Sequence, residues 1–336
     1  MKNLYIPENY KCKQDVITTE KAIKFVKDNF EKALSKKLSL IRVSAPILVF
    51  SNTGLNDDLN GVERAVRFDI KELDGKNAEI VHSLAKWKRT ALKKYGFTKE
   101  TGLYTDMNAI RRDDDIDNIH SIYVDQWDWE KVIDREERTV EYLKKTVQDI
   151  VDVIYEVNEM TKKEFSELSL NMTKKCTFIT TSQAEEMFPD LTPKQRETAL
   201  TKKYGTVFLM QIGKKLKNGL PHDGRAPDYD DWDLNGDILL YNEVLQSSFE
   251  ISSMGIRVDA NSLKSQLEER NKTERLNLYY HKQIMNNELP LTIGGGIGQS
   301  RLCMFILQKA HIGEVQVSLW PEGLEEEAKK HDIHIL

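Results

Sequence analysis

The densest run of glycine in the chain lies at residues 291–302, which read LTIGGGIGQSRL. Clustered glycine usually marks a tight turn or a close approach of the backbone to a ligand, because each glycine costs conformational entropy. Two common phosphate loops are excluded: Gln299 stands where a dinucleotide fingerprint needs its last glycine, and the lysine of a P-loop is absent. A strand that enters a helix near Gln299 would let a flat ligand lie on bare backbone, with Arg301 reaching a phosphate or stacking on a base. A glycine turn required for helix–sheet packing is an equally good interpretation.

A second group of polar residues belongs to a predicted hairpin at 109–130, AIRRDDDIDNIHSIYVDQWDWE. Arg111 would project from its base, and an arginine fork suits an α-phosphate or a carboxylate because it binds two oxygens. On the return strand, the alternation of a β-strand places Gln126 and Asp128 on one face, which favours a site role for both. The three aspartates at 113–115 are better explained as a solvated loop.

Carboxylates are concentrated in two further segments. Residues 222–237, HDGRAPDYDDWDLNGD, hold six aspartates around Arg225. So many like charges repel unless they meet a metal ion, a ligand ammonium group or an arginine, although a flexible surface loop would explain some of them. Glu250 stands inside an apolar predicted strand, where an unpaired carboxylate is costly to bury. It therefore needs a partner, for which Mg²⁺ and Arg257 are the candidates.

The periodicity of the chain predicts the elements that must position these residues. Helices are expected at 19–38 (with Thr19 as N-cap), 86–94, 136–157, 262–287 and 299–310, and capping boxes at Ser182 with Glu185 and Thr192 with Gln195. Strands are expected at 38–49 (meeting Pro46), 64–70, 78–84, 118–132 and 205–212, and as an antiparallel pair within 237–259. This order lacks the regular βαβ alternation of a Rossmann fold and favours an α+β fold, a mainly antiparallel sheet flanked by helices.

Length and composition predict one globular domain over 1–336, with a helical inserted subregion at about 136–203. The net charge of −5 and the absence of a long lysine/arginine tract disfavour extensive nucleic-acid binding. The sequence shows no signal-peptide core and no run of about 18 apolar residues. Three widely spaced cysteines fit a reducing compartment. We therefore expect a cytoplasmic protein without a membrane partner.

Taken together, these motifs resemble one known family. The first helix and the strand at Pro46, the arginine hairpin and the GGGIGQSR segment follow the order of motifs 1, 2 and 3 of class II aminoacyl-tRNA synthetase catalytic domains. The segments HSLAKWKR, HSIYVDQWDWE, RAPDYDDW, LNGDILLYNEVLQSSFEISSMGIRVD and GGGIGQSR resemble ammonia-dependent asparagine synthetase, the aspartate–ammonia ligase family, over nearly the whole chain. The resemblance implies a class II synthetase-like fold, a homodimer, and conversion of ATP, L-aspartate and ammonia into L-asparagine, AMP and diphosphate through a β-aspartyl adenylate.

The same resemblance implies roles for individual residues. It puts Gly294, Gly295 and Gly296 beneath adenosine, Arg301 on the nucleotide, Arg111 on the α-phosphate, and Asp237 and Glu250 among the ligands of Mg²⁺ and the nucleotide. Around aspartate or the adenylate it puts Asp57, Lys88, Gln126, Asp128, Asp230 and Ser253, with Arg225 and Ser121 as further members. Arg111, Asp57 and Lys88 form the expected catalytic set, in which Asp57 accepts the proton that ammonium must lose. The segment between Trp232 and Asn235 is shorter than in the family, which leaves the register of Asp230 and Asp231 open.

Two other functions share part of this pattern. An aspartyl-tRNA synthetase would carry the same three motifs, but motif 3 ends near Gly313 and no anticodon-binding domain is predicted, so we expect no tRNA partner. A non-catalytic relative that kept only the fold is disfavoured because both motif arginines, Arg111 and Arg301, are present.

Overall fold

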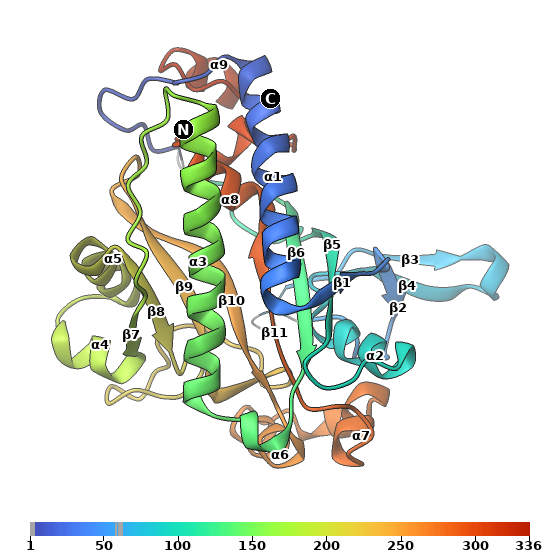
Figure 1. The fold of residues 1–336 in the computed structure, drawn as a ribbon. Helices are drawn as coiled ribbons and strands as arrows, with labels where there is room; N and C mark the ends of the chain where they lie inside the picture. Colours follow the sequence, from blue (N-terminus) through green and yellow to red (C-terminus); the bar gives the residue numbers. More distant parts are fainter. Residues whose placement is uncertain (1–3, 58, 60–62) are drawn as a thin grey trace.

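The computed structural model describes residues 4–57, 59 and 63–336, and its centre is an eight-stranded sheet (Figure 1). The strand order is β1-β5-β6-β11-β10-β9-β8-β7. Neighbouring strands are antiparallel except at the two edges, where β1 pairs with β5 and β7 with β8 in parallel. The predicted mainly antiparallel sheet is therefore confirmed, with a parallel pair added at each edge.

The strands of the large sheet are β1 Leu40–Arg42, β5 Gly102–Ile110, β6 Tyr123–Val132, β7 Thr177–Thr180, β8 Thr206–Met210, β9 Asp230–Asn242, β10 Ser247–Arg257 and β11 Thr292–Gly298. A smaller sheet of order β2-β4-β3 comprises β2 Leu48–Phe50, β3 Arg67–Ile70 and β4 Lys76–Ile80. The hairpin of β3 and β4 projects from the body of the molecule (Figure 1). The α-helices are α1 Val16–Leu38, α2 Ala85–Tyr95, α3 Val140–Glu164, α4 Thr181–Met187, α5 Pro193–Tyr204, α6 Ala260–Glu269, α7 Tyr279–Met285, α8 Gln299–Ile306 and α9 Leu324–Lys329. Short 3-10 turns are η1 Lys71–Leu73, η2 Arg135–Glu137, η3 Thr273–Asn277 and η4 Ile312–Glu314.

Helices α1 and α3 lie side by side across one face of the large sheet (Figure 1). The apolar stripe of α1 is buried there, and the ring of its Phe30 lies 4.7 Å from that of Trp127 on β6. Because successive side chains of a strand point to opposite faces, the inward direction of Trp127 and Trp129 turns Gln126 and Asp128 to the other face. The sheet therefore has one face for the core and one for a site.

Several expected boundaries differ from the structure for local reasons. Helix α1 begins at Val16, because the carboxylate of Asp15 accepts the N–H of Thr18, so the prediction of Thr19 as N-cap was wrong. The predicted box at Ser182 was also wrong. Strand β7 enters α4 directly, and its last residue, Thr180, already has the extended backbone of an N-cap and pairs reciprocally with Gln183.

Other expectations are confirmed or refined. The box of Thr192 with Gln195 is confirmed, and the helix expected at 86–94 is present as α2, which ends at Tyr95 with Gly96 as its C-cap. The strand expected at 38–49 is split into β1 and β2 on either side of Pro46. The helix expected at 299–310 ends at Ile306, and that expected at 136–157 begins at Val140 after a 3-10 turn. Segment 136–203 holds α3, α4 and α5 and also adds β7 to the sheet edge; its status as an inserted subregion stays a prediction.

A search of the described residues for a membrane-crossing helix found none that is both long and apolar enough.

Candidate active site

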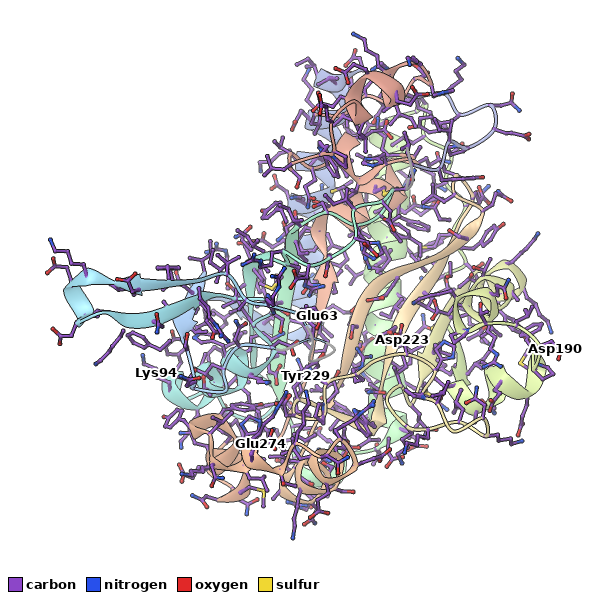
Figure 2. All side chains as sticks on the ribbon, turned by 180° about the vertical axis from the view of Figure 1, so that it is seen from behind. Glu63, Lys94, Asp190, Asp223, Tyr229 and Glu274 are labelled. Carbon is purple, nitrogen blue, oxygen red and sulfur yellow. The ribbon has the colours of Figure 1, made fainter. Side chains whose placement is uncertain are left out.

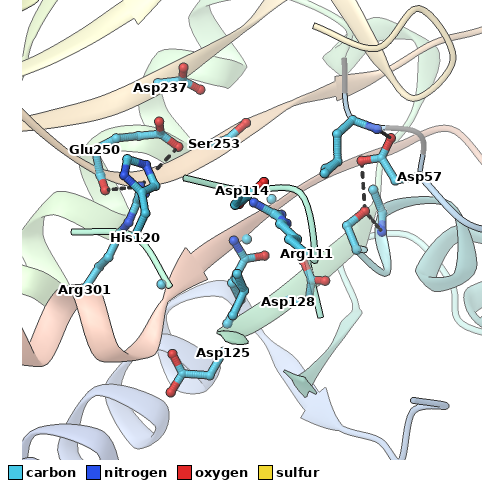
Figure 3. A pocket seen from close by; sticks show the side chains of 18 of the residues that line it. Asp57, Arg111, Asp114, His120, Asp125, Asp128, Asp237, Glu250, Ser253 and Arg301 are labelled. Carbon is cyan, nitrogen blue, oxygen red and sulfur yellow. Dashed lines mark hydrogen bonds and ion pairs between the residues drawn. The ribbon is translucent and has the colours of Figure 1, made fainter. Parts of the chain in front are cut away.

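A cavity of about 330 Å³ opens on the face of the sheet that turns away from α1 and α3 (Figures 2 and 3). Figure 2 looks onto this face and labels three lining residues, Glu63, Asp223 and Tyr229. Of the residues that the sequence predicts for a site, the cavity is lined by Asp57, Lys88, Arg111, Ser121, Gln126, Asp128, Arg225, Asp230, Asp237, Glu250, Ser253, Gly295, Gly296 and Arg301. Gly294 is the one predicted residue that is not part of the lining.

At one end of the cavity, Lys88 on α2 forms a buried pair with Asp128 on β6. The ammonium nitrogen lies 2.6 Å from Oδ1 of Asp128 and donates to the carbonyl oxygen of Gly295 at 3.0 Å. The other carboxylate oxygen of Asp128 accepts the N–H of Leu84 at 3.2 Å. Burial lowers the pKa of Lys88, and the negative charge of Asp128 opposes that effect. These bonds fix both charged groups in position at the cavity wall.

Beside this pair, Arg257 at the end of β10 joins three strands. Its guanidinium donates to Glu130 on β6, with the closest contact at 2.8 Å, and to Asp230 at the start of β9. The hydroxyl of Thr292 donates to the same Glu130 carboxylate at 2.7 Å. A Cβ atom on Gly294 would lie 2.2 Å from Oε2 of Glu130. A buried ion pair thus occupies the space that a side chain at Gly294 would need, and the place of Gly294 beneath adenosine stays a prediction.

The other glycines of this segment lie within strand β11 and not in a turn. A Cβ atom on Gly295 would lie 2.5 Å from Cβ of Met254, and one on Gly296 would lie 2.4 Å from Oε1 of Gln126. The turn interpretation was therefore wrong. The bare strand lets neighbouring side chains lie against its backbone, and at Gly295 and Gly296 it also forms part of the cavity wall.

At the other end of the cavity, Arg301 lies beside Glu250, and Arg111 lies between this end and Asp57 (Figure 3). Arg301 donates to the carbonyl oxygen of Glu250 at 3.1 Å, and its guanidinium lies 3.9 Å from the Glu250 carboxylate. Arg111 donates to the carbonyl oxygen of His82 at 3.3 Å. The expected pairing of Glu250 with Arg257 was wrong, because the register of the sheet brings Arg257 to Glu130 instead.

Between the two ends, Arg225 bridges β9 and β10. It donates to Oδ1 of Asp237 at 2.7 Å and to the hydroxyl of Ser253, which faces Asp237 across the strand pair. Burial, opposed by Arg225 and reinforced by the charge of Glu250, raises the pKa of Asp237 to about 7. The pKa of Glu250 is lowered, since the arginines and Lys194 around it outweigh the effect of burial.

The carboxylates of Asp237 and Glu250 fit the requirements of Mg²⁺. Within the described residues, no group of three or more His, Cys, Asp or Glu side chains forms a complete metal cage. Two cavity-lining carboxylates without such a cage suit Mg²⁺, which usually keeps several waters and binds one or two carboxylates together with substrate phosphates.

Each aspartate of segment 222–237 meets a cation, as its charge density predicts. Asp228 pairs with Lys86, Asp231 with Arg138 and Asp230 with Arg257. Asp223 and Asp233 are exposed and pair with lysines; Asp223 lies in a loop, as the alternative interpretation expects, whereas Asp233 lies within β9. Of the two aspartates whose register the sequence leaves open, Asp230 lines the cavity and Asp231 does not.

Comparison with known proteins identifies the family of this chain. A model of the family described as aspartate-ammonia ligase matches residues 17–332. The chain is 55% identical over 336 residues to the aspartate–ammonia ligase of Ruminiclostridium cellulolyticum, which covers 100% of both chains. It is 58% identical over 321 residues to that of Clostridium tetani, which covers 96% of this chain and 94% of the relative. The protein belongs to the aspartate–ammonia ligase family.

The fold of this ligase family member is also found in larger proteins. Asparaginyl-tRNA synthetase from Pyrococcus horikoshii, solved in complex with asparaginyl-adenylate, superposes with a TM-score of 0.64 at 18% identity, covering 90% of this chain and 70% of that one. The expected class II synthetase-like α+β fold is therefore confirmed.

Several cavity residues of this family member were missed by the sequence analysis. His120 and Tyr229 line the cavity and lie inside motifs that were recognised, so their place in HSIYVDQWDWE and RAPDYDDW was an available signal. Asp114 also lines it, which corrects its assignment to a solvated loop. Gln316 accepts the hydroxyl of Ser121 at 2.6 Å and lies beyond the last recognised motif, so no sequence signal pointed to it.

Asp125 supports Arg301 from the core side of β6. Its carboxylate accepts the N–H of Ser300 at 3.0 Å and the hydroxyl of the same residue at 2.8 Å, at the first turn of α8. Lys27 on α1 balances the charge at 3.1 Å. A carboxylate at a helix N-terminus satisfies orphan N–H groups, so Asp125 fixes the start of the helix that carries Arg301.

Proposed function

We propose that this protein forms L-asparagine from L-aspartate, ammonia and ATP, with AMP and diphosphate as products. The single observation that carries the proposal is one cavity that is lined both by a fixed ammonium–carboxylate pair, Lys88 with Asp128, and by two arginines, Arg111 and Arg301, whose hydrogen bonds go to carbonyl oxygens. Membership of the aspartate–ammonia ligase family supports the same reaction.

The reaction begins with attack of an oxygen of the aspartate side-chain carboxylate on the α-phosphorus of ATP. That bond forms as the bond to diphosphate breaks, which gives a β-aspartyl adenylate. The role proposed for Arg111 is to stabilise charge on the α-phosphoryl group, because a fixed donor in a low-dielectric site is worth more than water. Mg²⁺ bound by Asp237 and Glu250 would supply Lewis-acid stabilisation of the phosphates.

Substrate positioning falls to side chains that the fold already holds. Lys88 and Asp128 present an ammonium and a carboxylate side by side, which suits the zwitterionic end of an amino acid. Gln126 and Ser253 add polar groups on the same cavity wall, and Arg225 and Asp230 lie next to them. Holding the reacting atoms about 3–3.5 Å apart converts a bimolecular attack into an effectively unimolecular one. Arg301, Ser121, Gly295 and Gly296 are proposed for the nucleotide.

In the second step ammonia attacks the β-carbonyl carbon, the bond to AMP breaks and one proton is lost. Asp57 is the proposed proton acceptor, because it lines the cavity and is 3% exposed. Ser83 donates to its carboxylate at 3.1 Å and the N–H of Leu59 donates at 3.0 Å. Burial raises the pKa of Asp57, which makes its carboxylate a stronger base than one in water.

An isotope experiment tests the adenylate. Aspartate labelled with ¹⁸O in its side-chain carboxylate is supplied with ATP, Mg²⁺ and ammonia, and the products are analysed by mass spectrometry. Transfer of one label to AMP is the expected result. Labelled inorganic phosphate together with ADP would show attack at the γ-phosphate and would refute the adenylate.

Free ammonia is the proposed nitrogen donor. A glutaminase site needs an activated nucleophile, and burial raises the pKa of both Cys176 and Cys303 to about 12. Neither these thiols nor Cys12 lines the cavity. Asparagine formation with ammonium chloride and with glutamine, under matched conditions, tests this. Efficient use of glutamine by the pure protein would contradict the proposal.

A homodimer that acts without tRNA is the proposed assembly. The exposed apolar side chains Ile41, Ile47, Phe50 and Phe68, on or beside β1, β2 and β3, support an interface between two copies near the motif 1 region. Light scattering at micromolar concentration tests the mass, and a stable active monomer would count against it. Asparagine formation in the absence of RNA, with no aspartate transferred to added tRNA, distinguishes this function from that of an aspartyl-tRNA synthetase.

A further inference from the structure

A buried ionic cluster lies next to the cavity without being used in the reaction above. Its centre is Asp228, which is 0% exposed and immediately precedes Tyr229 of the cavity wall. One oxygen of Asp228 accepts Lys86 of α2 at 2.8 Å and Arg275 of η3 at 3.1 Å, and lies 2.9 Å from Nε2 of His281 of α7. The cluster therefore joins four segments that are distant in sequence.

Lys86 connects this cluster to the segment that carries Asp57. Its ammonium also donates to the carbonyl oxygen of Asn56 at 3.1 Å. The side-chain oxygen of Asn56 in turn accepts the N–H of Asp57 at 3.0 Å and that of His82 at 2.9 Å. The same segment packs against α7: Gly54 has φ +76°, and a Cβ atom there would lie 3.1 Å from the ring of His281. Asp57 is thus held through Lys86 and Asn56 by bonds that Asp228 orients.

We propose that Lys86 and Asp228 are positioning residues for the amide-forming step, which hold Asp57 at the cavity wall and set its charge in opposite directions. The proposal rests on the function proposed above, in which Asp57 accepts the proton lost by the attacking nitrogen. Neither residue lines the cavity, so neither is expected to touch a substrate.

The charges around Asp57 give the sign of each effect. Burial raises the pKa of Asp57; Lys86 lowers it, Asp228 raises it further, and Arg111 lowers it. Tyr229 also faces Asp57, and His82 contacts the carbonyl oxygen of Asp57 through Nδ1 at 2.9 Å. Removing the positive charge of Lys86 therefore raises the pKa of Asp57, whereas removing the negative charge of Asp228 lowers it. A protonated Asp57 cannot accept a proton, so a higher pKa moves the acid-side loss of rate to higher pH.

The test uses the variants Lys86→Gln and Asp228→Asn of the full chain, with Lys93→Gln as the matched control. Lys93 lies on the same helix, where its pair with Glu288 is exposed. Asparagine formation is measured between pH 6 and 8.5 as a ratio to the wild-type rate, because the ratio cancels the protonation of ammonia in solution. Aspartate-dependent exchange of labelled diphosphate into ATP reports the adenylate step alone.

Opposite pH trends are the expected result. The relative rate of Lys86→Gln falls from the alkaline to the acid end, by at most about tenfold for each unit of pKa shift, whereas that of Asp228→Asn rises. The ratio for Lys93→Gln stays flat, and diphosphate exchange by all variants shows no matching trend. Trends in the same direction, trends opposite to those expected, or flat ratios for both cluster variants would overturn the proposal.

A double variant serves as the control for loss of folding. Breaking one side of a buried ion pair is strongly destabilising, so Lys86→Gln is compared with the double variant Lys86→Gln with Asp228→Asn, which removes both charges. The double variant is expected to return the pH trend toward wild type, and failure to do so counts against the proposal. Wild-type protein that forms no asparagine and exchanges no diphosphate would instead contradict the proposed function itself.

Discussion

The two ends of the cavity differ in how their charged groups are engaged. At the aspartate end, Lys88, Asp128, Glu130 and Arg257 are nearly inaccessible to solvent, and their charges are paired with one another or with Asp230. Arg111 and Arg301, which are proposed to bind the nucleotide, have partly exposed guanidinium groups, and their hydrogen bonds go to carbonyl oxygens.

This difference separates residues that hold the fold together from residues that are ready to meet a ligand. A buried charge without its partner is costly, so the aspartate end is stable only as a complete network. A guanidinium bonded to a neutral carbonyl keeps most of its capacity for an anion, so we expect Arg111 to meet a phosphate without losing an ion pair, and Arg301 to lose only its 3.9 Å contact with Glu250. Substitution of an arginine is therefore expected to affect folding at one end and rate at the other.

The largest expected effect is that of Arg257→Met. The free energy of unfolding should fall by about 3–5 kcal/mol, because Glu130 and Asp230 lose their shared cation while they stay buried. Urea unfolding followed by circular dichroism measures this. An unfolding midpoint equal to that of wild type would show that the buried network around Arg257 does not stabilise the fold.

The same substitution at the other end, Arg111→Met, should lower the rate and spare the fold. We expect kcat to fall about 10²–10³-fold, the usual cost of removing one donor that stabilises transition-state charge. The unfolding midpoint should stay near that of wild type, since the hydrogen bonds lost are long ones to a carbonyl. Steady-state kinetics and urea unfolding of the same preparation provide both readings, and near-wild-type kinetics would contradict the role of Arg111.

Two glycines of β11 allow a finer comparison within one strand. Gly294→Ala places a methyl group against the Glu130 carboxylate and should lower stability by about 1–3 kcal/mol. Gly296→Ala meets the end of the flexible Gln126 side chain instead, so it should raise KM for aspartate with a smaller loss of stability. Thermal unfolding and aspartate titrations of both variants test this difference. Equal loss of stability in the two variants would contradict the different roles expected for Gly294 and Gly296.

The smallest effect is expected for Arg301→Met. Loss of a charged hydrogen bond to the nucleotide should raise KM for ATP at least about tenfold, because such bonds contribute roughly 1.5 kcal/mol or more. The value of kcat should change less than in Arg111→Met. A large fall in kcat at unchanged KM would show that Arg301 stabilises the transition state, which is the role proposed for Arg111.

Local patterns were enough to predict much of this site. The alternation of β6 predicted that Gln126 and Asp128 share a face, and the structure confirms it, because the pleat alone determines the direction of successive side chains. The family resemblance led to fourteen cavity-lining residues in segments that lie more than two hundred residues apart, which composition and periodicity would not have connected. At two helix starts the capping rule allowed more than one residue as the N-cap. The structure has Asp15 and Thr180 there, because these residues have the extended backbone that an N-cap needs.

The sequence by itself determined the elements, the family and the residue types of the cavity, because helix and strand periods and motif letters are properties of short windows of chain. The tertiary structure alone decided which charges pair. Arg257 meets Glu130, 127 positions away, and Asp230 through a shift of register between β9 and β10, whereas Glu250 faces Arg301. Lys88 meets Asp128, and Gly294 makes room for an ion pair. Charge attraction at these distances depends on geometry that exists only once the strands are aligned, so no local pattern encodes the partners.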